Sequence, residues 1–210
     1  EELAWEAIAE AIDDSGVAPA DIDAAFVGSV FGPPGVANRA LAGAGLGGIP
    51  AFKIEAACAS GTVAFHEAQH AVASGRYENV IAVGVEQLST QFAGPIVPEL
   101  GDPEGRSGLA MPALYALQAS RYLQEFNVDP ALLAEVAVKN KAHGALNSRA
   151  HISGTPPTAA EVLESRPIAG PLTLLQCCPM SDGAGAAIIT PFVESESDES
   201  SAQGRQVEIL

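Results

Sequence analysis

Apolar side chains recur at helical spacing in the first fifteen residues of the chain. Five of them would share one face of a helix: Leu3, Ala7, Ile8, Ala11 and Ile12. Gly16 follows directly, and glycine is a common residue just past a helix C-terminus. The pattern predicts an amphipathic helix over residues 1–15.

Beyond this helix, short runs rich in β-branched residues alternate with longer helical stretches. The expected strands are 25–31, 51–56, 79–85 and 185–190, and the expected helices between the first three strands are 35–46 and 59–74. Helices of this length serve as crossover connections between parallel strands. We therefore predict an α/β fold, layered α/β/α, in which helices cover both faces of a mainly parallel, mixed sheet.

The alternation of strands and helices stops after Glu86. Glycine and proline interrupt residues 94–108, and helices are expected again at 112–126 and 130–145. We interpret residues 87–150, approximately, as an inserted loop and helical region within one domain over 1–202. Residues 195–201 resemble an acidic, Ser-rich linker, and 206–210 the first strand of a further domain that would start at 203.

Composition and charge argue against two classes of binding partner, nucleic acids and membranes. The chain has 210 residues, 48% of them hydrophobic, and a formal net charge of -16 with only three lysines. A chain of this length can bury a hydrophobic core. Nucleic-acid binding is not expected, because it needs clustered cations that this sequence lacks. We expect no membrane anchor either, because no apolar run reaches the roughly 20 residues that span a bilayer and no signal peptide is recognisable. An acidic, lysine-poor surface also fits adaptation to high salt, which we hold as a hypothesis.

Three cysteines do not make a disulfide framework, and this favours a reducing cytoplasm. We interpret the adjacent Cys177 and Cys178 as structural residues that pack as small apolar groups. Asp182 and Gly183 are expected to form a turn into the last strand. His143 and His151, in polar segments, are expected on the solvated surface.

The third cysteine, Cys58, lies where an expected strand runs through small residues into an expected helix. Peptide N–H groups at a helix N-terminus are unpaired and carry partial positive charge, so a thiolate is stabilised there. Ala59, Ser60 and Gly61 would let a bulky thioester approach the sulfur. A buried structural thiol is the alternative, and location alone leaves both interpretations open.

The segments around Cys58 resemble the nucleophile region of thiolases, in particular the archaeal and sterol-carrier-protein-like branch. The matching segments are Cys58-Ala-Ser-Gly, Ala73-Ser-Gly75 and Val83-Gly-Val-Glu86. Ketoacyl synthases share much of this outline. Two later segments favour thiolase: Lys139-Asn-Lys-Ala-His-Gly-Ala-Leu-Asn147 and, more specifically, Pro171-Leu-Thr-Leu-Leu-Gln-Cys-Cys-Pro-Met-Ser-Asp-Gly-Ala184. Because the resemblance covers nearly the whole chain in order, it favours Cys58 as a catalytic nucleophile.

The resemblance implies an acyltransferase whose substrates are acyl-CoA thioesters such as acetyl-CoA, with no tightly bound cofactor and no metal. Cys58 would form the acyl-enzyme, and its backbone N–H would be one donor of an oxyanion hole. The acyl group would then condense with a second acetyl-CoA, and the reverse reaction would cleave a 3-ketoacyl-CoA. Met111 would border the acyl-pantetheine arm, or else be a core or loop-packing residue. A homodimer or homotetramer is implied, with the strand before Cys58 paired across a two-fold axis.

A competing motif overlaps the helix after Cys58. The segment His66-Glu-Ala-Gln-His70 matches H-E-x-x-H, in which two imidazoles on one helical face bind zinc and the Glu acts as base. A zinc protease also needs a third ligand, and only Glu86 or Glu99 lies at a loosely suitable position. We interpret this helix as scaffold and expect no metal.

Thiolases activate the thiol and the second thioester with histidines from an Asn-Glu-Ala-Phe-type segment and a Gly-His-Pro segment, which this sequence lacks. We therefore expect the chain to be the amino-terminal half of such an enzyme and not fully active alone. Three alternatives stay open. A complementary subunit or a larger complex could bring the histidines, the chain could belong to a ketoacyl synthase III-like condensing enzyme, or it could be a non-catalytic acyl-CoA-binding or scaffolding subunit.

Overall fold

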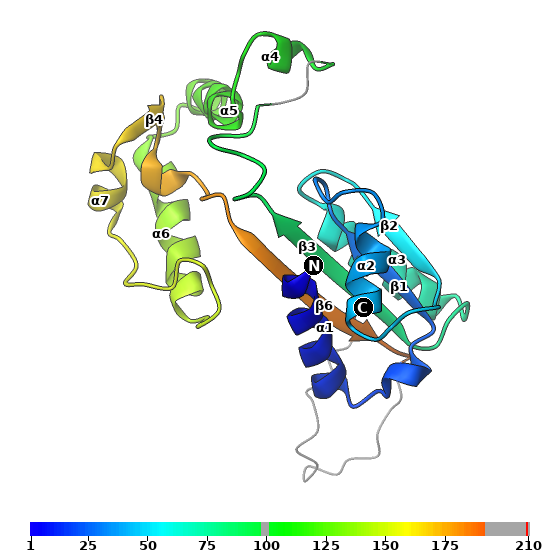
Figure 1. Ribbon diagram of the computed structural model, residues 1–210. Helices are drawn as coiled ribbons and strands as arrows, with labels where there is room; N and C mark the ends of the chain where they lie inside the picture. Colours follow the sequence, from blue (N-terminus) through cyan, green and yellow to red (C-terminus); the bar gives the residue numbers. More distant parts are fainter. Residues whose placement is uncertain (98–100, 192–208, 210) are drawn as a thin grey trace. The chain divides into compact units, whose positions relative to one another are not determined.

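The computed structural model describes residues 1–97, 101–191 and 209, and it divides the chain into two compact units (Figure 1). Unit 1 comprises Glu1–Leu88 and Asp182–Leu210, and unit 2 comprises Ser89–Ser181. The expected linker at 195–201 and the expected strand at 206–210, apart from Ile209, lie outside the described residues. Unit 2 is therefore an insertion into the chain of unit 1.

Unit 1 is built on a four-stranded sheet with the order β2-β1-β3-β6. The strands are β1 (Ala24–Gly28), β2 (Ala51–Ile54), β3 (Val80–Gln87) and β6 (Asp182–Ile189). β1 pairs in parallel with both β2 and β3, whereas β6 runs antiparallel to β3. The expected mainly parallel, mixed sheet is thereby confirmed.

Helices cover both faces of this sheet (Figure 1). They are α1 (Glu2–Ser15) and α2 (Val36–Gly43) on one face and α3 (Ser60–Ala73) on the other. Alternate side chains of the strands point to opposite faces, so Val27 and Ile81 pack with Ile8 of α1, while Phe26 packs with Ala68 of α3. Each face of the sheet has its own apolar core, as the expected α/β/α layering requires.

Two strand ends differ by three residues from the sequence-based expectation. β1 stops at Gly28 and not at residue 31, because the N–H groups of Val30 and Phe31 bind the Glu86 side chain and not a neighbouring strand. β6 begins at Asp182, so the expectation of a turn at Asp182 and Gly183 is wrong. These residues pair with Gln87 and Glu86, because the antiparallel register continues to the end of β3.

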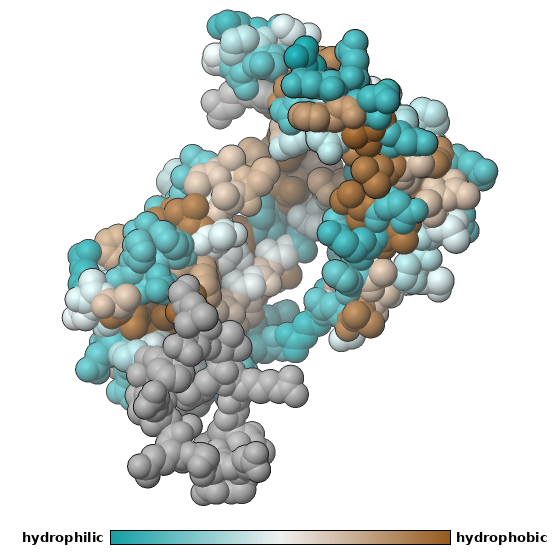
Figure 2. Space-filling model, turned by 180° about the vertical axis from the view of Figure 1, so that it is seen from behind, coloured by the Kyte–Doolittle hydropathy of each residue, from teal (hydrophilic) through white to brown (hydrophobic). Residues whose placement is uncertain are grey.

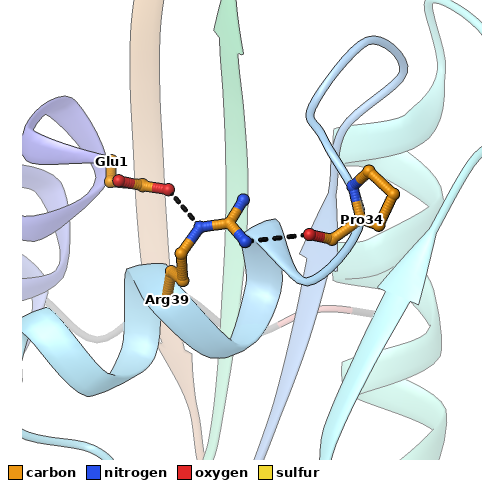
Figure 3. A network of polar contacts seen from close by, with 3 residues as sticks. All are labelled: Glu1, Pro34 and Arg39. Carbon is orange, nitrogen blue, oxygen red and sulfur yellow. Dashed lines mark hydrogen bonds and ion pairs between the residues drawn. The ribbon is translucent and has the colours of Figure 1, made fainter.

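An ion pair connects the start of α1 to α2 and to the loop that follows β1 (Figure 3). Arg39 of α2 contacts the Glu1 carboxylate through Nε and donates from Nη1 to the Pro34 carbonyl oxygen at 2.8 Å. Both side chains are partly exposed, so the ion pair itself adds little stability. The contact to Pro34 fixes the far end of the loop between β1 and α2.

Unit 2 contains four α-helices and a small antiparallel sheet among its described residues. These elements are α4 (Pro103–Arg106), α5 (Met111–Phe126), α6 (Ala131–Ala145), α7 (Ala159–Glu164), β4 (Pro167–Ala169) and β5 (Leu172–Thr173). α5 and α6 confirm the helices expected at 112–126 and 130–145. α4, α7 and both short strands were not expected from the sequence.

Many large apolar side chains of unit 2 are exposed, and hydrophobic residues are visible on its surface in Figure 2. Phe126 is 62% exposed and Leu146 is 87% exposed. Its buried residues are few and include Val162 of α7 and Ala134 of α6. No helix among the described residues is long and apolar enough to cross a membrane.

Candidate functional site

Cys58 lies in the turn between β2 and α3, and its side chain is exposed. β2 ends four residues before it, and α3 begins two residues after it, at Ser60. The peptide dipoles of this 14-residue helix favour negative charge at its N-terminal end. The structure thus gives Cys58 the strand-to-helix position that the sequence predicts, and an accessible sulfur.

Two side chains, one from each side of Cys58 in the sequence, fix the backbone just before this residue. The Glu55 carboxylate accepts the N–H of Ala57 at 2.7 Å. The buried Ser60 hydroxyl accepts the N–H of Ala56 at 2.9 Å and donates to the Ala57 carbonyl oxygen at 2.6 Å. Ala57 is held at a φ of 47°, a left-handed conformation that is uncommon for a residue with a Cβ. The sequence indicated Ser60 only for its small size, and its bonding role was missed.

Glycines let the first turn of α3 lie directly on the backbone of the sheet. A Cβ on Gly28 of β1 would be 2.4 Å from the Ser60 carbonyl oxygen, and a Cβ on Gly61 would be 3.7 Å from the Cα of Gly84 in β3. Open α/β sheets bind ligands at the carboxyl ends of their parallel strands, and the Cys58 turn lies at that edge. The close packing of α3 on the sheet therefore requires Gly28, whereas a Cβ at Gly61 would make only an ordinary van der Waals contact with Gly84.

Glu86, one candidate for a third zinc ligand, has other partners. Its half-buried carboxylate accepts the N–H of Val30 at 2.8 Å and the N–H of Phe31 at 3.3 Å. Those bonds direct its oxygens toward the loop after β1. The other candidate, Glu99, lies outside the described residues.

The H-E-x-x-H residues do come together on the exposed side of α3. One ligand atom each from His66, Glu67 and His70 lies within 4.8 Å of the others, and all three residues are exposed. Two imidazoles one helical turn apart can chelate a transition metal, but a closed tetrahedral site needs further ligands. On its opposite side the helix buries Ala64 and Ala68 against the sheet. That packing supports the scaffold role, and the absence of a metal stays a prediction.

Met111 is the first residue of α5, in unit 2. It is half-buried, and its N–H donates to the Ile96 carbonyl oxygen at 2.8 Å. This contact joins the start of α5 to the preceding loop. Cys58 belongs to unit 1, so a role for Met111 beside the substrate stays a prediction.

The remaining candidates also lie in unit 2. Cys177 is half-buried and Cys178 is exposed, so only Cys177 has the packed position that we expected of both. Burial, and secondarily the neighbouring Cys178, raises the pKa of the Cys177 thiol, which makes it a poor nucleophile. His143 and His151 are both exposed, as expected, and Nδ1 of His151 lies 2.5 Å from the Ser181 hydroxyl oxygen.

Comparison with known proteins gives matches along most of the chain. The family model described as "Thiolase, N-terminal domain" matches residues 1–192. The acetyl-CoA acetyltransferase of Methanothermobacter thermautotrophicus is 38% identical over 189 residues, which cover 86% of this chain and 49% of that protein. Sterol carrier protein 2 of Gallus gallus is 31% identical, over 100% of this chain and 40% of its own length.

A solved structure, the Ltp2-ChsH2(DUF35) aldolase, has a similar fold. Its TM-score is 0.74 at 28% sequence identity, and the match covers 90% of this chain and 50% of that chain. The chain thus spans about half the length, or less, of the relatives it matches. The expected α/β layering is confirmed by this neighbour as well as by the sheet itself.

Proposed function

Because this chain belongs to the thiolase family through its amino-terminal domain, we propose that Cys58 is the nucleophile of an acyl transfer from coenzyme A thioesters. The observation that carries the proposal is the exposed thiol of Cys58 in a fixed turn at the N-terminus of α3. The archaeal relative is an acetyl-CoA acetyltransferase, which makes acetyl-CoA the first substrate to test.

In the proposed first step, the Cys58 sulfur bonds to the acyl carbon of an acyl-CoA. The bond from that carbon to the sulfur of coenzyme A breaks, and coenzyme A leaves as the thiol with the proton that Cys58 gave up. The N–H of Cys58, near the positive end of the α3 dipole, would stabilise the oxyanion of the tetrahedral intermediate. The Cys58 turn supplies the nucleophile and this oxyanion donor. The step also needs a proton acceptor for the Cys58 thiol.

The second step would form the carbon–carbon bond. The methyl carbon of a second acetyl-CoA loses a proton and attacks the acyl carbon, and the Cys58 sulfur leaves as the thiolate. In the reverse direction, coenzyme A cleaves a 3-ketoacyl-CoA. This step needs a base and an acid that we propose come from the half of the relatives that the chain does not span, in the same polypeptide or in a complementary subunit.

Incubation with acetyl-CoA and measurement of intact mass test the first step. We expect one acetyl group on the wild-type chain, none on Cys58→Ala, and one on Cys178→Ala, the matched change at another exposed thiol. Acetylation that persists in Cys58→Ala would contradict the proposal. We also expect no acetoacetyl-CoA from these 210 residues alone. Its formation at the rate of a complete enzyme would refute the proposed division of the site.

An aldolase-type cleavage is the second candidate function, and it is supported by the similarity to the Ltp2-ChsH2(DUF35) aldolase. Aldol cleavage passes through no acyl-cysteine. Cleavage of a 3-hydroxyacyl-CoA that survives Cys58→Ala would therefore favour the aldolase, whereas loss of acyl transfer in the same variant favours the thiolase.

We also propose that the protein assembles as a homodimer or homotetramer, or with a complementary subunit. β2, which precedes the Cys58 turn, is an edge strand of the sheet formed by the described residues, and an edge strand can pair with a second copy. The name of the structural neighbour joins Ltp2 to ChsH2(DUF35), which supports the two-component alternative. The mass from light scattering distinguishes these states, and a monomer at all concentrations would contradict self-association through β2.

A further inference from the structure

The carboxylate of Glu86 organises the loop that follows β1. Oε2 accepts the N–H of Val30 at 2.8 Å, and both carboxylate oxygens lie 3.3 Å from the N of Phe31. Hydrogen bonds from peptide N–H groups to an ionised carboxylate are among the stronger ones in proteins. The backbone at these residues therefore curves around one half-buried charge.

Ser29 extends this arrangement by one further residue. Its side chain is buried, its hydroxyl donates to Glu86 at 3.5 Å, and its oxygen accepts the N–H of Gly32 at 3.1 Å. A Cβ on Gly32 would be 2.4 Å from that hydroxyl oxygen, so the closed shape of the loop requires a glycine there. Residues 29–32 are hereafter called the Glu86-bound loop. The Glu86 carboxylate binds Ser29, Val30 and Phe31 directly, and it holds Gly32 through the Ser29 hydroxyl.

The Glu86-bound loop begins beside the nucleophile turn. Its first residue, Ser29, donates its N–H to the carbonyl oxygen of Ile54, the last residue of β2, at 3.1 Å. Gly28, the residue before, lies against the carbonyl of Ser60. Ser60 in turn fixes the backbone before Cys58 through its hydroxyl. A displacement of the loop would therefore be transmitted to the turn that carries the sulfur.

Two cationic side chains lie near the loop, but neither takes over the hydrogen bonds that Glu86 makes. The Lys53 ammonium donates to the carbonyl oxygen of Gly32 at 3.3 Å, and Arg39 donates to that of Pro34 (Figure 3). Both contacts go to carbonyl oxygens at and beyond the end of the loop. The N–H groups at its centre bind the Glu86 carboxylate.

We propose that Glu86 is a positioning residue for acyl transfer, and that it acts by holding residues 29–32 beside the Cys58 turn. The proposal rests on the proposed function, because it assumes that an acyl thioester lies against the sulfur. Misplacement of an acyl group by about 1 Å can reduce a rate on the order of 100-fold. Attack by a small, freely diffusing reagent on the same sulfur depends far less on such positioning.

The variant Glu86→Gln tests the proposal, because it keeps the shape of the side chain and removes its charge. We expect acetylation of Cys58 by acetyl-CoA to slow on the order of tenfold or more. Alkylation of Cys58 by iodoacetamide should stay within about twofold of wild type, since the thiol remains exposed. Hydrogen exchange at the Val30 and Phe31 amides should accelerate, while amides of β3 remain protected.

Glu78→Gln, at an exposed glutamate just before β3, is the matched control and should leave all three measurements unchanged. Ser29→Ala is the second variant, for the case that Glu86→Gln fails to fold. It keeps the contacts of Glu86 to Val30 and Phe31 and should give a smaller loss of acetylation in the same direction.

Two outcomes would overturn the inference. Equal acetylation rates in wild type and Glu86→Gln would show that the loop is merely structural, even if its amides exchange faster. Equal losses of acetylation and alkylation would show general damage to the turn. If wild type is alkylated but never acetylated, the proposed function itself is wrong, and the inference fails with it for a different reason.

Discussion

Gly28 is the residue at which β1 and the first turn of α3 come closest. An added Cβ would lie 2.4 Å from the Ser60 carbonyl oxygen and 2.6 Å from the Gly61 nitrogen. Both are backbone atoms, so neither can rotate away.

We expect Gly28→Ala to lower the free energy of unfolding by roughly 2 kcal/mol or more, because α3 must move off the sheet. Urea unfolding followed by circular dichroism measures this change. Gly47→Ala is the control, since nothing lies within 4 Å of its added Cβ. The same midpoint for Gly28→Ala and Gly47→Ala would show that α3 does not require glycine at residue 28.

Among individual site residues, Cys58 could be located from the sequence and Glu86 could not. Cys58 occupies a position defined by its neighbours along the chain, a strand before and a helix after, and local patterns report such positions. Glu86 binds N–H groups 55 and 56 residues away. Only the pairing of β1 with β3 brings those groups together, and that pairing has no local signature.

At the scale of elements, Asp23 joins the starts of β1 and β3. Its carboxylate accepts the N–H groups of Glu78 and Asn79, each at 2.9 Å. The hydrogen bond from the Asn79 N–H, and to a smaller extent the one from the Glu78 N–H, lowers the pKa of Asp23 below its ordinary value. A lowered folded-state pKa stabilises the fold at neutral pH, and this contribution is lost as pH falls through the folded pKa.

Asp23→Asn should therefore be less stable than wild type at pH 7, and the difference should shrink as the pH falls below about 4, because Asp23 loses its charge as the pH passes through the lowered folded-state pKa. Thermal unfolding at several pH values measures the gap. Asp14→Asn, on the exposed side of α1, is the matched control. A gap that stays constant from pH 7 to pH 3 would mean that the charge of Asp23 does not contribute.

α3 offers a separate test through its H-E-x-x-H residues. We expect protein purified without added zinc to contain less than stoichiometric metal, because the exposed group His66, Glu67 and His70 provides no closed coordination shell. Elemental analysis of wild type and His66→Ala decides this. Stoichiometric zinc that disappears in His66→Ala would contradict the scaffold interpretation of α3.

The elements that the sequence predicts best are those with long periodic patterns. α1, α3, α5 and α6 lie within about two residues of their expected limits. The helix α7 was missed because it has only six residues, although Thr158 and Glu161 form a capping box that is visible in the sequence. The start of β6 was missed because Asp-Gly usually signals a turn, whereas tertiary pairing with β3 extends the strand through both residues.

At the scale of the whole molecule, the net charge of -16 is the dominant electrostatic feature. Like charges repel in the compact state, and salt screens them: the Debye length falls from about 10 Å at 0.1 M to about 3 Å at 1 M. We therefore expect the Tm to rise by several degrees between dilute and molar KCl.

Differential scanning calorimetry over a range of KCl concentrations measures this shift. A neutral osmolyte at matched osmolality is the control, because it stabilises by exclusion from the surface without screening charge. A Tm that is unchanged by KCl, with full folding at low salt, would contradict adaptation to high salt.

The antiparallel pairing of β3 with β6 has a further consequence for how this chain can vary. Gln87 and Asp182 are direct partners in that pairing, so both ends of the segment 88–181 leave the sheet at neighbouring points. A hairpin turn of two to five residues could close the same gap. We therefore expect that the length and content of this insertion can change while the sheet that carries the cysteine keeps its register.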